Sequence, residues 1–259
     1  MLPYYKSCDV TKTYRFLSYR LKFIMIKLHS FGSAFGLIDA SPFVTKVKLF
    51  MTMHSIEFEE IHDADKLNKA PKQKFPYLED GQVVIADSDA ILKYLSEKHD
   101  INMDSWLSDQ QLALSHLLSK SLEENLYWCL VQSRWLNEDT WPTVKDHFFG
   151  SMPFPLNKII PKIAKSGTVK RINGHGMGAH TKEEVLAIAE QSFDSLSVLL
   201  ANKPFFFGDK LCTFDLIAFS QLSAFTLSSL DNPSNRAAKK HANLVNYTKQ
   251  ISKTYYPDL

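Results

Sequence analysis

Residues 74–88 read KFPYLEDGQVVIADS, and this stretch carries the clearest structural signals in the chain. Pro76 cannot donate a hydrogen bond to a neighbouring strand, so it belongs at a strand entrance or in a turn. Two short strands, residues 77–79 and 82–85, are joined around Asp80-Gly81, a dipeptide typical of hairpin turns. The stretch therefore predicts a β-hairpin that is entered through a proline.

A helix follows the hairpin directly. Asp87-Ser88-Asp89 provides side chains that commonly cap a helix N-terminus. The apolar residues that come next recur at the spacing of one helical face: Ala90, Ile91, Tyr94 and Leu95.

Upstream, residues 26–61 have the pattern of a βαβ unit. Alternation over residues 26–31 predicts one strand and residues 56–61 predict a second, while Ser41-Pro42 opens a helix between them. In that helix the predicted buried stripe is Val44, Val47, Phe50 and Met51, with Thr45, Lys46 and Lys48 turned outward. With the hairpin and its helix, this order predicts a thioredoxin-like α/β domain with a mixed sheet.

Beyond about residue 105 the strand signals vanish. Helices are predicted at residues 109–136, 155–166, 181–200, 213–230 and 243–253, with a break at Trp141-Pro142. We therefore expect an N-terminal extension (1–24), a thioredoxin-like domain (25–100) and an all-α helical-bundle domain (105–259).

Composition and charge exclude several classes of function. The 30 basic and 28 acidic residues are mixed along the chain without a basic stripe, which argues against nucleic acid as a partner. Three cysteines, widely spaced and without a CxxC pair, argue against a disulfide scaffold and structural zinc and indicate a reducing, cytoplasmic compartment. No apolar run approaches the ~20 residues of a membrane span.

The first 24 residues are basic, but they lack the apolar core and cleavage site of a secretory signal. We interpret them as an upstream extension, with Met25 as an alternative start.

Three motifs resemble glutathione transferases in order and spacing: SPFVTKV at residues 41–47, KFPYL at 74–78 and IADSDAI at 85–91. A narrower resemblance, to the bacterial relatives of metaxin and the failed-axon-connections proteins, rests on four further stretches. These are FGL at residues 35–37, NLYWCLVQSRWL at 125–136, the segment from His175 to Glu184, and the ending YPDL. The resemblance implies glutathione as co-substrate, no metal, and a homodimer.

The resemblance also implies a binding site, and elementary chemistry supports it. Ser88 and the helix amides after it suit the γ-glutamyl carboxylate of glutathione, and Asp87 suits its ammonium group. Ser41, at another helix N-terminus, suits the thiolate. The implied residues are Ser41 (catalytic), Lys74, Phe75, Pro76 in cis, Asp87 and Ser88 (glutathione), and Tyr127, Arg134 and Trp135 (substrate pocket).

Each of these assignments has a plainer alternative. Ser41, Asp87 and Ser88 are also ordinary capping residues, and an aromatic stripe such as that around Trp135 is more often core. His175 and His180 lack a third metal ligand nearby, so residues 174–180 are interpreted as a flexible interhelical connection.

Departures from the relatives widen the functional choice. Val44 stands where relatives of this subfamily often have cysteine, which removes a thiol–disulfide role at this helix. Cys212 replaces the usual Ser or Thr helix cap, with Asp215 retained. The first hypothesis is a transferase that conjugates glutathione to a small hydrophobic electrophile. The alternatives are a non-catalytic, metaxin-like binding or scaffold protein, and a glutathione-dependent peroxidase or lyase.

Overall fold

The structure is a computed structural model that describes residues 25–258, without the side chains of residues 64–66. The predicted extension at residues 1–24 lies outside the described residues. One mixed four-stranded sheet has the order β2-β1-β3-β4. Its strands are β1 (Ile26–Ser30), β2 (Phe58–His62), β3 (Tyr77–Asp80) and β4 (Val83–Ala86).

The strand directions confirm the predicted βαβ unit and hairpin. β1 and β2 are parallel and are connected through α1 (Pro42–Met53), whereas β1–β3 and β3–β4 are antiparallel. A short 3-10 helix (Ala64–Lys69) lies between β2 and β3, and α2 (Ser88–His99) follows β4. Leu28 pairs with Leu78 across the sheet, and both side chains are fully buried.

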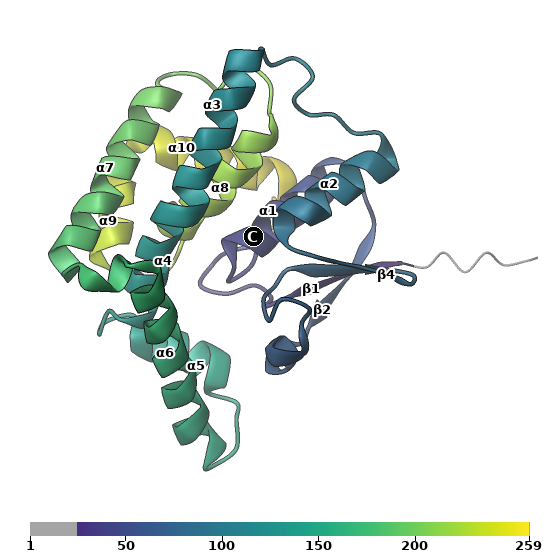
Figure 1. The fold of residues 1–259 in the computed structure, drawn as a ribbon. Coiled ribbons are helices and arrows are strands. Elements are labelled where there is room, and N and C mark those ends of the chain that lie inside the picture. The colour runs from purple at the N-terminus through teal and green to yellow at the C-terminus, as the bar shows by residue number, and fades with distance from the viewer. Residues whose placement is uncertain (1–24, 259) are drawn as a thin grey trace, which may run out of the picture.

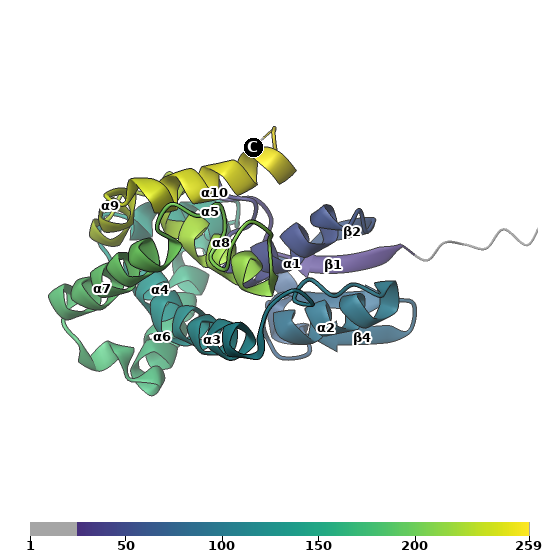
Figure 2. The same ribbon diagram turned by 90° about the horizontal axis from the view of Figure 1, so that it is seen from above.

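The rest of the described chain is helical. Its helices are α3 (Asp109–Lys120), α4 (Tyr127–Trp135), α5 (Trp141–Phe149), α6 (Leu156–His175), α7 (Lys182–Leu200), α8 (Thr213–Thr226), α9 (Pro233–Lys239) and α10 (Ala242–Tyr255). A π-helical turn (Ser121–Leu126) joins α3 to α4. Figures 1 and 2 show α8 in the middle of this half, and α1 packs directly against it. The fold is a thioredoxin-like domain followed by a helical bundle.

Helix boundaries differ from the prediction in three places. Trp141-Pro142 is not a break but the first turn of α5, because proline is tolerated where no helical N–H bond is needed. The helix predicted at residues 155–166 continues to His175, past Pro161 in its interior. The helix predicted at residues 213–230 ends at Thr226, and the short α9 was not predicted.

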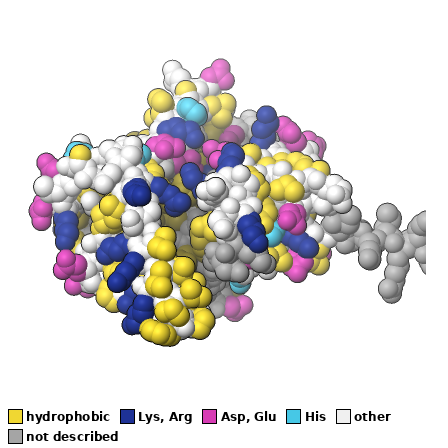
Figure 3. Space-filling model, turned by 60° about the horizontal axis from the view of Figure 1, so that its bottom comes forward, with side chains coloured by type: hydrophobic (Ala, Val, Ile, Leu, Met, Phe, Trp, Pro, Cys, Tyr) yellow, Lys and Arg dark blue, Asp and Glu magenta, His cyan; other side chains and the backbone are white. Residues whose placement is uncertain are grey.

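The outward face predicted for α1 was also wrong. Thr45, Lys46 and Lys48 are buried, with exposures of 3%, 1% and 7%. The reason is tertiary, because α1 lies between the sheet and the helical half and has neighbours on more than one face. Viewed from below, the molecule is hollowed between its two halves (Figure 3).

Candidate active site

The proline loop and the start of α2 lie against each other. The peptide bond between Phe75 and Pro76 is cis, as predicted, and Phe75 is buried. The backbone amide of Asp87 donates to the Pro76 carbonyl at 3.4 Å. This bond places the Lys74–Pro76 loop beside Asp87 and Ser88, so the residues predicted to bind one ligand are neighbours in space. Lys74 itself is exposed.

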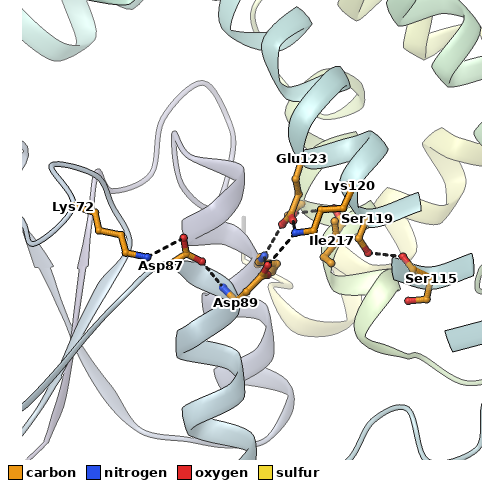
Figure 4. Close-up of polar contacts among 10 residues, drawn as sticks. Lys72, Asp87, Asp89, Ser115, Ser119, Lys120, Glu123 and Ile217 are labelled. Atoms are coloured by element: carbon orange, nitrogen blue, oxygen red, sulfur yellow. Dashed lines mark hydrogen bonds and ion pairs between the residues drawn. The ribbon is translucent and has the colours of Figure 1, made fainter. Parts of the chain in front are cut away.

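Asp87 has an unusual backbone and a solvent-facing carboxylate. Its φ of 95° lies in a region that residues with side chains rarely adopt, and such strain clusters at ligand sites. The carboxylate accepts a hydrogen bond from the Asp89 amide at 3.1 Å and pairs with Lys72 at 3.5 Å (Figure 4). Its side chain is nevertheless 48% exposed. Asp87 therefore caps α2 and still presents negative charge to solvent.

Ser88 is the first residue of α2 and is buried. At this position its own amide belongs to the first turn, whose N–H groups lack helical partners and carry partial positive charge. Within residues 25–258 its hydroxyl makes no hydrogen bond to a protein group. The cap of α2 is Asp87, so the simple capping role left open for Ser88 belongs to its neighbour.

Ser41 occupies the N-cap position of α1, but its side chain does not cap the helix. Its backbone amide donates instead to the Asp39 carboxylate at 2.8 Å. The Ser41 hydroxyl is half-buried at the end of the β1–α1 loop, and in the described part of the chain it has no hydrogen-bond partner.

Asp39 holds the loop that carries Ser41, and sequence reasoning missed this residue. Its carboxylate also accepts a hydrogen bond from the Gly32 amide at 2.8 Å, so it closes the loop at both ends. Asp39 is only 1% exposed, and burial raises its pKa to about 7 although two amides and Lys48 oppose the shift. A local signal for this role was its position two residues before Ser41, because an aspartate side chain commonly accepts a hydrogen bond from the backbone amide two residues on.

Arg134 reaches this loop from α4. Its guanidinium donates to the Ala40 carbonyl at 2.6 Å and lies 5.7 Å from the centre of the Phe35 ring. Arg134 is 7% exposed, and burial lowers its pKa to about 10. Its Nε and Nη2 atoms are buried, and neither has a hydrogen-bond partner among the described residues. An arginine that retains two unused donors beside the Ser41 loop is suited to an electronegative ligand atom.

The other two predicted pocket residues, Tyr127 and Trp135, pack against aromatic neighbours. The ring of Tyr127 packs edge-on against Phe43 at 4.8 Å. Trp135 packs against Trp141 of α5 at 5.3 Å and faces Phe148 at 6.4 Å. The structure therefore brings Arg134 to the Ser41 loop, whereas Tyr127 and Trp135 pack against helices at its flanks.

An aromatic cluster that the sequence did not reveal lines the same region. The rings of Phe31 and Phe75 meet at 4.9 Å, and Phe148 of α5 approaches Phe31 at 5.9 Å and Phe35 at 6.3 Å. The cluster connects the proline loop, the β1–α1 loop and α5. It places apolar surface beside Ser41 and Arg134, as an apolar substrate requires.

A buried ion network stands behind the start of α2. The ammonium group of Lys46 lies 2.5 Å from Glu123 and 2.6 Å from Asp89. Lys120 lies 3.4 Å from Asp89 (Figure 4). Burial opposes ionisation of Asp89, but the two lysines outweigh it and lower its pKa. Burial raises the pKa of Glu123 against the pull of Lys46. The network ties α1 and α2 to the α3–α4 junction.

Two features are absent from residues 25–258. No group of three or more His, Cys, Asp or Glu side chains is placed to hold a metal ion. Over the same residues, no helix combines the length and apolarity needed to cross a membrane.

Comparison with known proteins agrees with this geometry. Residues 42–141 match the glutathione S-transferase N-terminal domain and residues 189–251 match the C-terminal domain. The isoprene-epoxide–glutathione S-transferase of Rhodococcus sp. (strain AD45) is 31% identical over 89% of this chain and 99% of that protein. Failed axon connections of Drosophila melanogaster is 28% identical over 90% of this chain and 59% of its own length.

Solved structures share the fold at low sequence identity. A glutathione transferase family member from Pseudomonas fluorescens, solved with two glutathione bound, superimposes with a TM-score of 0.56 at 13% identity, covering 90% of both chains. A glutathione S-transferase from Methylobacterium radiotolerans, in complex with glutathione sulfonate, gives 0.58 at 14% identity, covering 88% of this chain and 90% of that one. The order of motifs, the mixed sheet with its helical bundle and the family matches lead to one conclusion: the chain belongs to the glutathione S-transferase family.

Proposed function

We propose that this protein binds glutathione and conjugates it to a small hydrophobic electrophile. The observation that carries the proposal is the junction of the proline loop with the start of α2, where Asp87 and Ser88 lie against Pro76. An epoxide is the first electrophile to test, because the Rhodococcus relative is named for an isoprene epoxide and matches nearly the whole chain.

Each part of glutathione has a matching group at this junction. The first turn of α2, with the Ser88 hydroxyl, suits the γ-glutamyl carboxylate, and the exposed Asp87 carboxylate suits the ammonium group. The Phe75 backbone suits the cysteinyl unit in a strand-like pairing. Lys74 adds an exposed positive charge beside them.

Ser41 is proposed as the catalytic residue. Its hydroxyl, which makes no cap bond, donates a hydrogen bond to the glutathione sulfur, and the N-terminus of α1 adds positive potential. Lowering a thiol pKa by two units corresponds to about 2.7 kcal/mol, which these two interactions together are able to supply.

Arg134 and the Phe31, Phe35 and Phe148 cluster are proposed to hold the electrophile. As the new carbon–sulfur bond forms, the carbon–oxygen bond of an epoxide breaks and its oxygen becomes negative before it takes a proton from water. The unused Arg134 donors are suited to that oxygen. Tyr127 and Trp135 shape the flanks of the pocket.

Titration calorimetry with reduced glutathione tests the binding site. We expect micromolar to low millimolar affinity for the wild-type protein and loss of measurable binding in Ser88→Ala and in Asp87→Ala. Ser195→Ala, on the exposed face of α7, is the matched control and is expected to bind normally. Absence of any heat at millimolar glutathione would reject the proposal.

A non-catalytic, metaxin-like role is the second candidate. Human metaxin-2 is 22% identical over 82% of this chain, and Val44 stands where related proteins often have cysteine. The two candidates differ in what they predict for glutathione, because only a transferase consumes glutathione together with an electrophile. A protein that binds no glutathione and consumes no epoxide or aryl halide would favour the scaffold.

We further propose a cytoplasmic homodimer with a role in detoxification. Cys129 and Cys212 are buried free thiols, as suits a reducing compartment. Exposed apolar side chains lie on β4 and α3 and suit a subunit interface: Val83, Val84, Leu112, Leu114 and Leu117. Cell fractionation with a compartment marker tests the location.

A further inference from the structure

The α5–α6 hairpin projects from the body of the molecule (Figure 1). Its tip and the first turns of α6 expose large apolar side chains: Phe154 is 81% exposed, Leu156 46%, Ile159 48% and Ile163 62%. No other ten-residue stretch of the described chain exposes as many large apolar side chains. Exposed apolar surface concentrated in this way indicates an interaction site.

From the end of α5 onward the same hairpin carries only basic charges. Between Asp146 and Glu183 the sequence contains no acidic residue, and it contains Lys158, Lys162, Lys165, Lys170, Arg171 and Lys182. Lys165 lies over the ring of Trp141 at 4.8 Å. Figure 3 shows hydrophobic side chains gathered on the lower part of the molecule, with Lys and Arg beside them.

Helical spacing places the two kinds of side chain in neighbouring stripes. Leu156, Ile159 and Ile163 recur at intervals of three and four residues and form one face of α6. Lys158, Lys162 and Lys165 recur at four and three, on the adjoining face. A lysine row beside an apolar stripe is the arrangement of helices that lie at the interface of a membrane.

We propose that the α5–α6 tip docks this protein onto an anionic lipid bilayer. An anionic bilayer matches both kinds of exposed side chain. Its hydrocarbon interior can bury the apolar stripe, and its phosphate groups can pair with the lysines. A second copy of the chain does not match both, because a symmetric contact through this face sets lysine rows of the same sign together. Phe154 lies in the connection between α5 and α6 and is highly exposed, and a fluid lipid surface accommodates such a side chain without a preformed pocket.

Sedimentation of the full chain with lipid vesicles tests the docking. The vesicles are phosphatidylcholine alone, or phosphatidylcholine with a third phosphatidylglycerol, at low and at high salt. We expect binding to the anionic vesicles only, weakened by high salt. Both the Phe154→Ser/Ile159→Ser/Ile163→Ser variant and the Lys158→Glu/Lys162→Glu variant are expected to lose roughly tenfold or more in partitioning.

Matched controls distinguish binding through this face from nonspecific effects of net charge or of exposed apolar surface elsewhere. Val198→Ser/Leu199→Ser removes exposed apolar surface from α7, and Lys249→Glu/Lys253→Glu changes the net charge identically on α10. Both controls are expected to bind vesicles as the wild type does, and thermal melts confirm that all variants fold.

Three results overturn the proposal. They are equal binding to neutral and anionic vesicles, no binding to either, and the same loss in the α10 charge control as in the α6 lysine variant. If the protein binds poly-glutamate but neither kind of vesicle, the second of these results points to an acidic protein partner. Because no step depends on glutathione, these outcomes are independent of the transferase proposal.

Discussion

Ser41 occupies the N-cap position of a helix, but its hydroxyl is not used to cap that helix. The loop before α1 is held instead through the Ser41 backbone amide by Asp39. The hydroxyl of a serine in that position is available to donate a hydrogen bond to a thiol sulfur.

We therefore expect Ser41→Ala to reduce conjugation without weakening the fold. The free energy of unfolding should change by less than about 0.5 kcal/mol, whereas loss of a true cap costs about 1 kcal/mol. The kcat is expected to fall at least roughly tenfold, with a raised pKa of bound glutathione. Urea unfolding, initial rates and thiolate absorbance check the three parts. A stability loss with unchanged kcat would return Ser41 to the role of a cap.

Arg134 is expected to discriminate between electrophiles. Replacing it with methionine removes the donors proposed for the epoxide oxygen, so kcat/KM for styrene oxide should fall about 100-fold. Benzyl chloride, which develops no oxyanion, should lose only a few-fold. Arg134→Lys is expected to retain part of the epoxide activity.

The control is Arg236→Met, because the Arg236 side chain is 57% exposed on α9. An equal loss on both substrates in Arg134→Met would mean that Arg134 only holds the Ala40 carbonyl.

Asp39 should make stability depend on pH. Burial raises its folded pKa above 3.8 to about 7, so its contribution to stability is complete below about pH 4 and is lost as pH rises through 7. The slope is at most about 1.4 kcal/mol per pH unit. The difference in unfolding free energy between wild type and Asp39→Asn is expected to shrink across this window. A difference in unfolding free energy between the two proteins that stays constant with pH would contradict the raised pKa of Asp39.

At the scale of elements, the Lys46 network holds α1, α2 and the α3–α4 junction together. Three charged residues meet at a position where Lys46 is 1% exposed, and the helices they come from are distant in the sequence. Buried charges of this kind are costly when one partner is removed, because the other stays desolvated.

Glu123→Leu is accordingly expected to destabilise the fold by about 3 kcal/mol. The double variant Lys46→Met/Glu123→Leu should recover at least half of that loss, since no buried ammonium then remains beside an apolar residue. Lys93→Ala, which breaks an exposed pair with Glu97 on α2, is the control and should cost less than about 0.5 kcal/mol. Additive losses in the double variant would refute the coupling.

At the scale of the whole molecule, the exposed apolar residues of β4 and α3 bear on assembly. β4 is an edge strand with Val84 53% exposed, and Leu117 on α3 is 66% exposed. Light scattering is expected to give twice the 29.6 kDa mass of one chain, and Val84→Glu/Leu117→Glu to give a folded monomer. Val198→Glu on α7 should leave the mass unchanged. A monomeric wild-type protein would reject the dimer.

The proposed active site and the α5–α6 tip are connected through α5. Phe148 of α5 belongs to the aromatic cluster beside Ser41, and α5 leads directly into the projecting tip. A bilayer-docked tip would place the proposed electrophile site next to the phase in which apolar electrophiles dissolve.

Features encoded by neighbouring residues were predictable. The hairpin after Pro76, the start of α1 at Ser41-Pro42 and the start of α2 at Asp87 follow from turn and cap chemistry. The cis bond before Pro76 was implied by the family resemblance, and the structure contains it. Motif order then predicted the family. The binding roles of Ser41, Asp87 and Ser88 stay predictions, which the structure makes sharper by showing which side chains cap and which do not.

Features that depend on partners far along the chain were decided by tertiary structure alone. Lys46 was placed outward because helical periodicity describes a helix with one neighbour, whereas α1 is enclosed between the sheet and the bundle. The Arg134 bond to Ala40 spans 94 residues, and no local pattern encodes it. Local chemistry was enough to predict the strands, most of the helices and the family, because turns, caps and periodicity involve neighbouring residues. It did not predict α5, α9 or the full length of α6. The buried charges and the aromatic cluster of the site depend on tertiary structure, because a side chain is buried only when segments distant in the sequence pack against it.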